Sequence, residues 1–221
     1  MVDLNSESIG TSNSEVKIDV QDIVDLGQLL LRFSRVERIT YHEDGERVET
    51  DSDHTVMLSV LACAIASELR PDLDIGKIAQ YALIHDLVEV YAGDTPTLKI
   101  TEDEKIEKQR KEAEALERIT GEFSSFPWLI ETMESYESLD TIEARFVKGI
   151  DKLMPIVTHL LNNGQLIKRH GMTKEQLLAR YDQMIQEMGE YSGDLPEVME
   201  LRDMMAKVFV GVMFPYSHST E

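Results

Sequence analysis

The sequence predicts an all-α fold, a helical bundle with at most one short β-hairpin near residues 38–49. Apolar residues recur at spacings of three and four along most of the chain, which is the period of an α-helix. Capping patterns and prolines divide that pattern into segments of helical length. No strands alternate with helices as a parallel sheet would require, and no internal repeat is present. The fold class is therefore predicted from two observations, the helical spacing of apolar residues and the capping patterns and prolines that divide the helices.

The 221 residues fit one domain, which we expect to span residues 17–221 and to include a C-terminal helical extension. A chain of this length buries a core without disulfides. Residues 1–16 are polar and acidic with little to bury, so we expect a disordered tail there. The domain would then begin with the first amphipathic segment.

The first predicted helix follows this tail, and the predicted hairpin follows the helix. Apolar side chains recur at helical spacing at Val20, Ile23, Val24, Leu30 and Leu31. The stretch 37–50 has no such period, and it contains Asp44-Gly45, which favours a tight turn between two strands. This is the one strand pair that the sequence predicts.

The next predicted helix carries His54. Ser52 or Asp53 is the expected N-cap, and the helix should stop before Pro71, because the residue before a proline disfavours the helical conformation. His54 then lies in the first turn.

A further helix is predicted from Asp74, its N-cap, to about Val90, and Gly93 should end it. Its last turns would hold His85, Asp86 and Glu89. Residues three and four apart share one side of a helix, so these polar groups can face the same point.

Capping boxes and prolines mark the helices of the second half. Residues 101–104 and 173–176 carry the reciprocal pattern that opens a helix. Between them, a helix carries Asp151 and meets Pro155, which should kink or restart it. The last helix should begin near Pro196.

The amino-acid composition limits which kinds of partner the protein can bind. The net charge of −20, from 42 acidic and 22 basic residues, opposes an extended nucleic-acid footprint, which needs clustered cations. A small phosphorylated ligand remains compatible, because a metal and one or two cations can make a local positive field. Cys63 is alone, so no disulfide forms. No secretory signal or membrane-spanning stretch is evident, and we expect a cytoplasmic protein with no membrane partner.

The residues with the strongest chemical signal are His54, His85, Asp86 and Asp151, which supply two imidazoles and two carboxylates. That is a complete ligand set for one divalent metal. Mixed nitrogen and oxygen ligands suit first-row transition ions, whereas an all-oxygen set would favour Mg²⁺ or Ca²⁺. We expect one divalent transition metal per chain, namely Mn²⁺, Co²⁺, Fe²⁺, Ni²⁺ or Zn²⁺.

The ordered series His54, His85-Asp86 and Asp151 resembles the HD-domain phosphohydrolase superfamily, in which such residues bind a divalent metal on a helical bundle. Within it, residues 20 to 160 resemble the 5′-deoxynucleotidases on four features: Arg35, Ser52-Asp-His54, His85-Asp86-x-x-Glu89 and Gly93-Asp94-x-Pro96. The resemblance implies a 5′-nucleotidase that hydrolyses (deoxy)nucleoside 5′-monophosphates to nucleoside and phosphate with metal-activated water. It also implies a homodimer.

The resemblance also implies roles. His54, His85, Asp86 and Asp151 would be the metal ligands. Glu89 and Asp94 would be catalytic acids outside the ligand set: Glu89 would hold or deprotonate the water, and Asp94 would protonate the leaving 5′-oxygen or bind the sugar, although the two roles can be exchanged. Arg35 would contact the phosphate.

One departure concerns the sugar. The position after the arginine is often tryptophan in the nucleotidases, and here it is Val36. We therefore expect weaker discrimination between deoxyribose and ribose. Lys152 is expected to lie outside the site, because adjacent helical residues point about 100° apart. His159 and His170 are expected at the surface or at helix ends.

Three other functions stay open. An HD triphosphohydrolase or pyrophosphohydrolase would need several cations for a longer phosphate chain, and the acidic composition favours a monophosphate. A dinuclear phosphodiesterase or di-iron oxygenase would need further histidines, and none lies between His85 and His159. A metal-bearing nucleotide sensor is the non-enzymatic alternative, against which Glu89 and Asp94 argue.

Overall fold

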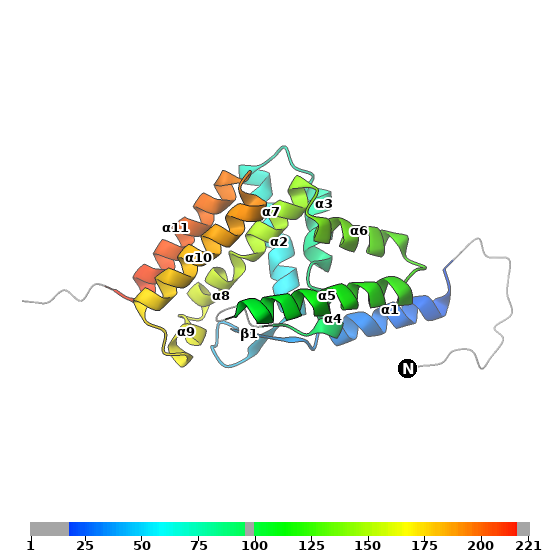
Figure 1. Cartoon of the computed structure of the whole chain (residues 1–221), viewed down its shortest axis with the longest axis horizontal. Helices are drawn as coiled ribbons and strands as arrows, with labels where there is room; N and C mark the ends of the chain where they lie inside the picture. The colour runs from blue at the N-terminus through cyan, green and yellow to red at the C-terminus, as the bar shows by residue number, and fades with distance from the viewer. Residues whose placement is uncertain (1–17, 96–99, 216–221) are drawn as a thin grey trace, which may run out of the picture.

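The computed structural model describes residues 18–95 and 100–215, which are helical apart from one two-stranded sheet (Figure 1). The elements, in chain order, are α1 (Val20–Phe33), β1 (Glu37–Tyr41), β2 (Val48–Thr50), α2 (Asp51–Leu69), α3 (Ile75–Ile84), α4 (Glu89–Ala92), α5 (Glu102–Glu122), α6 (Pro127–Ser138), α7 (Ile142–Asp151), α8 (Met154–Leu161), α9 (Gln165–Arg169), α10 (Lys174–Ser192) and α11 (Pro196–Met213). The all-α prediction is confirmed. The predicted tail, residues 1–16, lies outside the described residues.

The predicted hairpin forms where the sequence places it. Strands β1 and β2 pair antiparallel, with Glu37 opposite Thr50. At the turn, the Asp44 carboxylate accepts the backbone N–H groups of the two residues after Gly45, at 2.8 and 3.0 Å. Gly45 has a φ of +70°, which only glycine adopts without strain. The Asp-Gly pair therefore specifies the turn locally.

Helix α2 begins earlier than predicted, because its N-cap is Thr50 and not Ser52 or Asp53. The Thr50 hydroxyl accepts the N–H of Asp53 at 3.3 Å, and the Asp53 carboxylate accepts the N–H of Thr50 at 3.1 Å. This is a capping box with Asp in the third position instead of the usual Glu or Gln. The chain thus passes from β2 into α2 without a loop, which places His54 beside the hairpin.

The single helix predicted from Asp74 is two helices, α3 and α4, although Asp74 is the N-cap and Gly93 the end, as predicted. Hydrogen bonds between residues three apart span the turn that joins them. The His85 ring nitrogen Nδ1 lies 2.9 Å from the Ala82 carbonyl oxygen, the acceptor that the Asp86 N–H would use in a continuous helix. The side chain therefore competes with the backbone, and the chain turns at the site.

In the second half of the chain, helices begin at the capping boxes and prolines that the sequence predicts. Thr101 and Thr173 open α5 and α10 with capping boxes, and Pro196 opens α11, as predicted. Pro155 lies in the first turn of α8, which restarts the chain just after α7 ends. Two helices were not predicted, α6, which opens with Pro127, and the short α9.

Two clusters of buried apolar side chains hold the fold together. The larger lies among α2, α3, α6 and α7 and includes Leu58, Ile78, Phe146 and Ile150. The smaller is built by α8 to α11 and includes Ile156, Leu177 and Phe209. Helices α10 and α11 lie side by side at one end of the long axis, and α1 lies toward the other (Figure 1). Helices α10 and α11 also contribute Met188 and Val198 to the larger cluster, so the two clusters are joined through the C-terminal helices.

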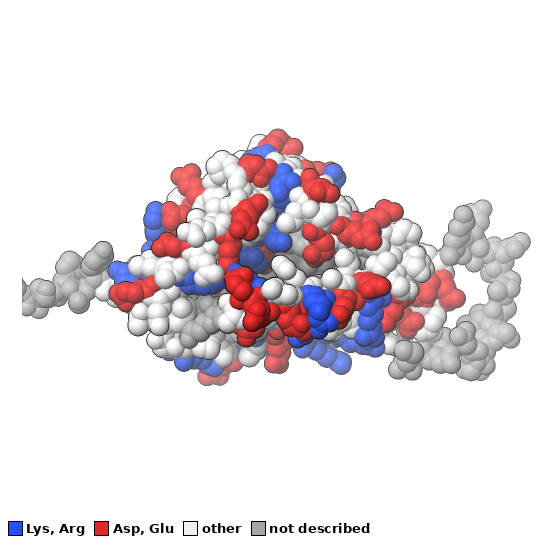
Figure 2. Space-filling view, viewed as in Figure 1, with Lys and Arg blue, Asp and Glu red and all other residues white. Residues whose placement is uncertain are grey.

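Acidic side chains spread over the face of the molecule in Figure 2, with basic side chains between them and no broad basic area on that face. This distribution agrees with the excess of acidic residues in the chain. None of the helices in the described ranges is long and apolar enough to cross a membrane.

Candidate metal centre and its cavity

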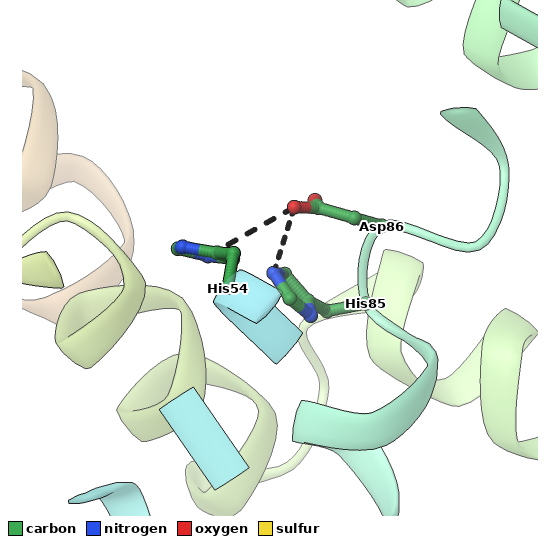
Figure 3. Close-up of side chains that lie close together, drawn as sticks. All are labelled: His54, His85 and Asp86. Atoms are coloured by element: carbon green, nitrogen blue, oxygen red, sulfur yellow. Dashed lines mark ion pairs between the residues drawn. The ribbon is translucent and has the colours of Figure 1, made fainter. Parts of the chain in front are cut away.

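Three parts of the chain bring the four predicted ligands together. His54 comes from the first turn of α2, His85 and Asp86 from the turn after α3, and Asp151 from the last residue of α7. The Asp86 carboxylate faces both imidazoles (Figure 3). Its Oδ2 lies 2.9 Å from His85 Nε2 and 4.0 Å from His54 Nε2. Asp151 Oδ1 lies 3.0 Å from His54 Nε2 and 3.9 Å from His85 Nε2.

This spacing fits one metal ion. Ligand atoms about 2.1 Å from a common ion lie about 3 Å apart at right angles and about 4 Å apart when opposite. The proton position on His85 also agrees with a bound cation. Its Nδ1 faces the Ala82 carbonyl, which can only accept, so the proton belongs on Nδ1. The lone pair of Nε2 then faces Asp86, and this buried nitrogen has no hydrogen-bond donor. Two lone pairs at 2.9 Å repel each other unless a proton or a metal ion lies between them.

A second layer of side chains orients His54. Its Nδ1 lies 3.6 Å from Oε1 of Glu49, a buried carboxylate that also accepts the Thr40 hydroxyl. Burial by itself would lower the pKa of His54, but the hydrogen bond to Asp151 and the nearby Glu49 carboxylate raise that pKa to about 9. The surrounding carboxylates therefore favour positive charge at His54. A divalent ion would supply that charge and displace a proton from the imidazole.

The two predicted catalytic acids line the same cavity. Glu89 opens α4 and is buried, and Asp94 follows Gly93 and is half-buried. Burial, with the nearby carboxylates of Asp86 and Asp51, raises the pKa of Glu89 to about 10. Burial also raises the pKa of Asp94. A raised pKa lets Glu89 hold a proton at neutral pH and hand it over.

The structure does not bring Arg35 to the cluster. Arg35 is exposed, and neither it nor Val36 lines the cavity. Arg38 does: its Nη1 lies 2.9 Å from Asp86 Oδ2 and 3.1 Å from Oδ1 of the fully buried Asp51. Burial would lower the pKa of Arg38, but Asp86 and Asp151 outweigh it and raise that pKa. Sequence reasoning missed Arg38, although two-residue alternation along β1 places it on the face of the buried Thr40.

The expectation for Lys152 is wrong, and that for His159 is half right, because His159 lies in the last turn of α8 but not at the surface. Lys152 reaches the site, where its Nζ donates to Asp151 Oδ2 at 2.6 Å. It follows the last residue of α7, and its long side chain turns back toward the carboxylate, so the angle between neighbours on a helix does not decide its position. His159 is buried and lines the cavity, whereas His170 is exposed at the end of α9 as expected.

One cavity extends from the cluster to the C-terminal helices, and about 950 Å³ of space lies between its walls, part of it open to solvent. The half next to the cluster is polar and is lined by Arg38, Asp86, Glu89, Asp94, Lys108, Asp151 and Lys152. The other half is mostly apolar and is lined by Pro155, Ile156, His159, Leu166, Ile167, Leu177, Arg180, Tyr181, Met184 and Arg202. The cavity thus joins a charged end to an apolar end.

Comparison with known proteins is consistent with this geometry. Residues 31–191 match the model of the HD domain family. The chain is 31% identical to 5′-deoxynucleotidase HDDC2 of Xenopus laevis over 75% of this chain and 79% of that protein. It is 32% identical to the human protein of the same name over 129 residues, 57% of this chain. The match spans about three fifths of the human relative, 60% of its length.

Solved structures share the fold. The chain superposes with a TM-score of 0.70 and 23% identity on a predicted metal-dependent phosphohydrolase from Magnetospirillum magnetotacticum MS-1, covering 87% of this chain and 93% of that one. A conserved hypothetical protein from Pyrococcus furiosus superposes with a TM-score of 0.58 and 23% identity, covering 82% and 99%.

Proposed function

The chain belongs to the HD domain family, and we propose that it is a metal-dependent phosphohydrolase acting on (deoxy)nucleoside 5′-monophosphates, which it converts to nucleoside and phosphate. The observation that carries this proposal is the convergence of His54, His85, Asp86 and Asp151, with the lone pair of His85 Nε2 facing Asp86. The nucleotide substrate is supported by the relatives named 5′-deoxynucleotidase.

These four side chains would hold one divalent transition ion, Mn²⁺, Co²⁺, Fe²⁺, Ni²⁺ or Zn²⁺, because they offer imidazole nitrogen and carboxylate oxygen. When bound, the ion supplies Lewis acidity toward the phosphoryl oxygens and a water that ionises near neutral pH. Ala82 and Glu49 hold the two imidazoles so that each Nε2 faces the cluster.

The surrounding residues would position the phosphate and move protons. Arg38 makes both of its carboxylate contacts through Nη1, so Nη2 and Nε would donate to the oxygens of one phosphate next to the cluster, the role that the resemblance gives to Arg35. Glu89 would exchange a proton with the attacking water. Asp94, on the turn beyond Gly93, would serve the leaving 5′-oxygen or the sugar hydroxyls.

Hydrolysis of a nucleoside triphosphate is the second candidate, because several cations line the cavity. The cations near the cluster are already paired, however. Arg38 pairs with Asp86, Lys152 with Asp151, and Lys108 lies 3.4 Å from Glu89 and 2.8 Å from Glu112. Little positive charge is left for two further phosphates, so a monophosphate fits the charged end better.

A homodimer is proposed from the apolar surface of α1 and α2. Leu31, Val56 and Val60 are more than half exposed, at 61%, 63% and 66%. Val56 and Val60 are four residues apart on α2 and share one exposed face, and exposed apolar faces are typical of protein interfaces. Light scattering of the purified chain should give twice the mass of one chain, and Val56→Glu with Val60→Glu should give the monomer. A monomeric wild-type protein would contradict the proposal.

Nucleotide hydrolysis with each candidate metal tests the function. Deoxynucleoside and ribonucleoside monophosphates and dATP would be offered, and phosphate, pyrophosphate and triphosphate release would be scored separately. We expect phosphate release from monophosphates, lost in Glu89→Gln. Triphosphate or pyrophosphate release from dATP alone would favour the second candidate. Tight binding of metal and nucleotide without any turnover would indicate a sensor.

A further inference from the structure

The apolar end of the cavity contains buried polar atoms that lack partners. Among the residues that the structure describes, His159 Nδ1 on α8, Tyr181 Oη on α10 and Arg202 Nε on α11 are buried without a hydrogen bond. All three residues line the one cavity that begins at the cluster. A buried polar group without a partner costs about 1–3 kcal/mol, and native proteins hold few of them. Three such groups, on three helices around one space, indicate a bound polar ligand.

Arg202 is the strongest of the three. Its side chain is fully buried, and no carboxylate in the described ranges lies within ion-pair distance of it. Its Nη1 makes a long contact of 3.4 Å to the Tyr181 carbonyl oxygen, and Nη2 lies 3.5 Å from the Met184 sulfur. The guanidinium also lies 4.9 Å from the centre of the Tyr181 ring. Burial lowers the pKa of Arg202, yet a guanidinium stays protonated in proteins. A buried cation therefore faces a cavity without a strong acceptor.

The walls around Arg202 limit the ligand group that fits. Ile156, Ile167, Leu177 and Met184 are apolar and line the cavity with it. A planar heteroaromatic ring suits such walls, provided that it presents acceptors to the guanidinium. The donors of arginine form a planar fork that matches two adjacent acceptors. A 6-oxopurine offers such a pair in O6 and N7, whereas adenine replaces O6 with an amino donor.

We propose that the apolar end of the cavity, formed by α8 to α11, is the base subsite of the enzyme, and that Arg202 selects 6-oxopurines by donating to O6 and N7. The inference rests on the proposed function, since the phosphate would occupy the metal cluster at the other end. It makes the C-terminal helices the source of base specificity, and Tyr181 and His159 further polar contacts of the ring.

The first test compares kcat/KM for dGMP, dIMP, dAMP, dCMP and dTMP. The wild-type enzyme should prefer dGMP and dIMP over dAMP by about 10- to 100-fold, the discrimination of one bidentate arginine contact. Arg202→Met should remove that preference and leave dAMP hydrolysis within about threefold. Arg118→Met, an exposed arginine on α5 paired with Glu122, is the matched control and should change nothing.

A second test needs no variant and so does not depend on Arg202→Met folding. The 7-deaza analogue of dGMP lacks only the N7 acceptor, and its kcat/KM should fall about tenfold below that of dGMP. The 7-deaza analogue of dAMP should match dAMP.

The outcomes separate the two proposals. Equal hydrolysis of all bases, equal loss for all bases in Arg202→Met, or an Arg202-dependent preference for dCMP would overturn the base subsite while leaving the phosphohydrolase in place. If no nucleotide is hydrolysed, thermal shift with dGMP against dAMP decides. If dGMP raises the melting temperature more than dAMP does, and Arg202→Met removes that difference, the catalytic proposal is wrong and the base subsite stands. If both nucleotides raise the melting temperature equally, both proposals are wrong.

Discussion

Each candidate ligand is held by a second contact that decides which atom faces the cluster. His85 is fixed through Ala82, His54 through Glu49, Asp86 through Arg38 and Asp151 through Lys152. Contacts of this kind set the tautomer and direction of a ligand. The cluster is therefore organised before any ion binds.

Removing a ligand should remove the metal. Asp86→Ala or His85→Ala is expected to lose both bound metal and hydrolysis, because three protein ligands hold the ion much more weakly than four. Elemental analysis and phosphate release measure the two losses. His170→Ala, an exposed histidine at the end of α9, is the control. Full metal content in both cluster variants would contradict the assignment.

Removing the proton carrier should leave the metal. Glu89→Gln keeps the shape of the side chain and is expected to retain metal and fold while losing about 10²- to 10⁴-fold in kcat. Metal content measured beside turnover separates the effects. Loss of metal from this variant would make Glu89 a ligand and not a proton carrier.

Replacement of Arg38 and replacement of Arg35 should have different effects on kcat/KM. Arg38→Met is expected to lower kcat/KM about 10- to 100-fold for every nucleotide alike, since a charged hydrogen bond contributes about 1.5–3 kcal/mol. Arg35→Met, exposed and three residues away, should change little. The measurement is kcat/KM of both variants on dAMP and dGMP, with the metal content of each variant as the control. The opposite order of effects would return the phosphate contact to Arg35.

At the scale of elements, two local events position the site. The Thr50 cap starts α2 directly after the hairpin, and the turn at His85 separates α3 from α4. The first directs His54 toward Asp151, and the second directs Asp86 and Glu89 into the cavity. Helix ends, where backbone groups and side chains are both available, carry most of this site.

The cap of α2 should be measurable in stability. Thr50→Ala is expected to reduce the free energy of unfolding by about 1 kcal/mol, because the N–H of Asp53 loses its acceptor. Thr50→Ser keeps the hydroxyl and should stay within a few tenths. Urea denaturation of the three proteins at pH 7 checks this, and equal midpoints would show that packing, not capping, holds the start of α2.

At the scale of the molecule, the cavity lies between the metal cluster and helices α8 to α11, and the smaller apolar cluster supplies Ile156, Ile167, Leu177 and Tyr181 to its walls. His159 lies in that wall and packs against Phe209, with ring centres 5.5 Å apart. Stability of the whole fold is therefore linked to the protonation of this buried imidazole.

Burial lowers the pKa of His159 to about 4, against about 6.5 in an unfolded chain. Between these values the unfolded state binds more protons, so stability is lost as pH falls from 6.5 toward 4, by about 3 kcal/mol in total. Urea denaturation at pH 7 and pH 4.5 measures the loss, which should be smaller in His159→Gln. An equal loss in both proteins would show that other groups cause it.

Residue type and local pattern in the sequence determined the helical class, the hairpin turn, most caps and the four ligand candidates, because a capping box or an Asp-Gly turn is made within a few residues. The sequence did not predict where α3 ends, because that end depends on a hydrogen bond from the His85 ring nitrogen to the Ala82 carbonyl oxygen. The places of Arg38, Lys152, His159 and Arg202 were decided only by the tertiary structure. Arg38 and Asp86 are 48 residues apart and Arg202 and Tyr181 are 21 apart. Such pairs meet only after the helices pack, and packing, not spacing, decides which charges share a cavity.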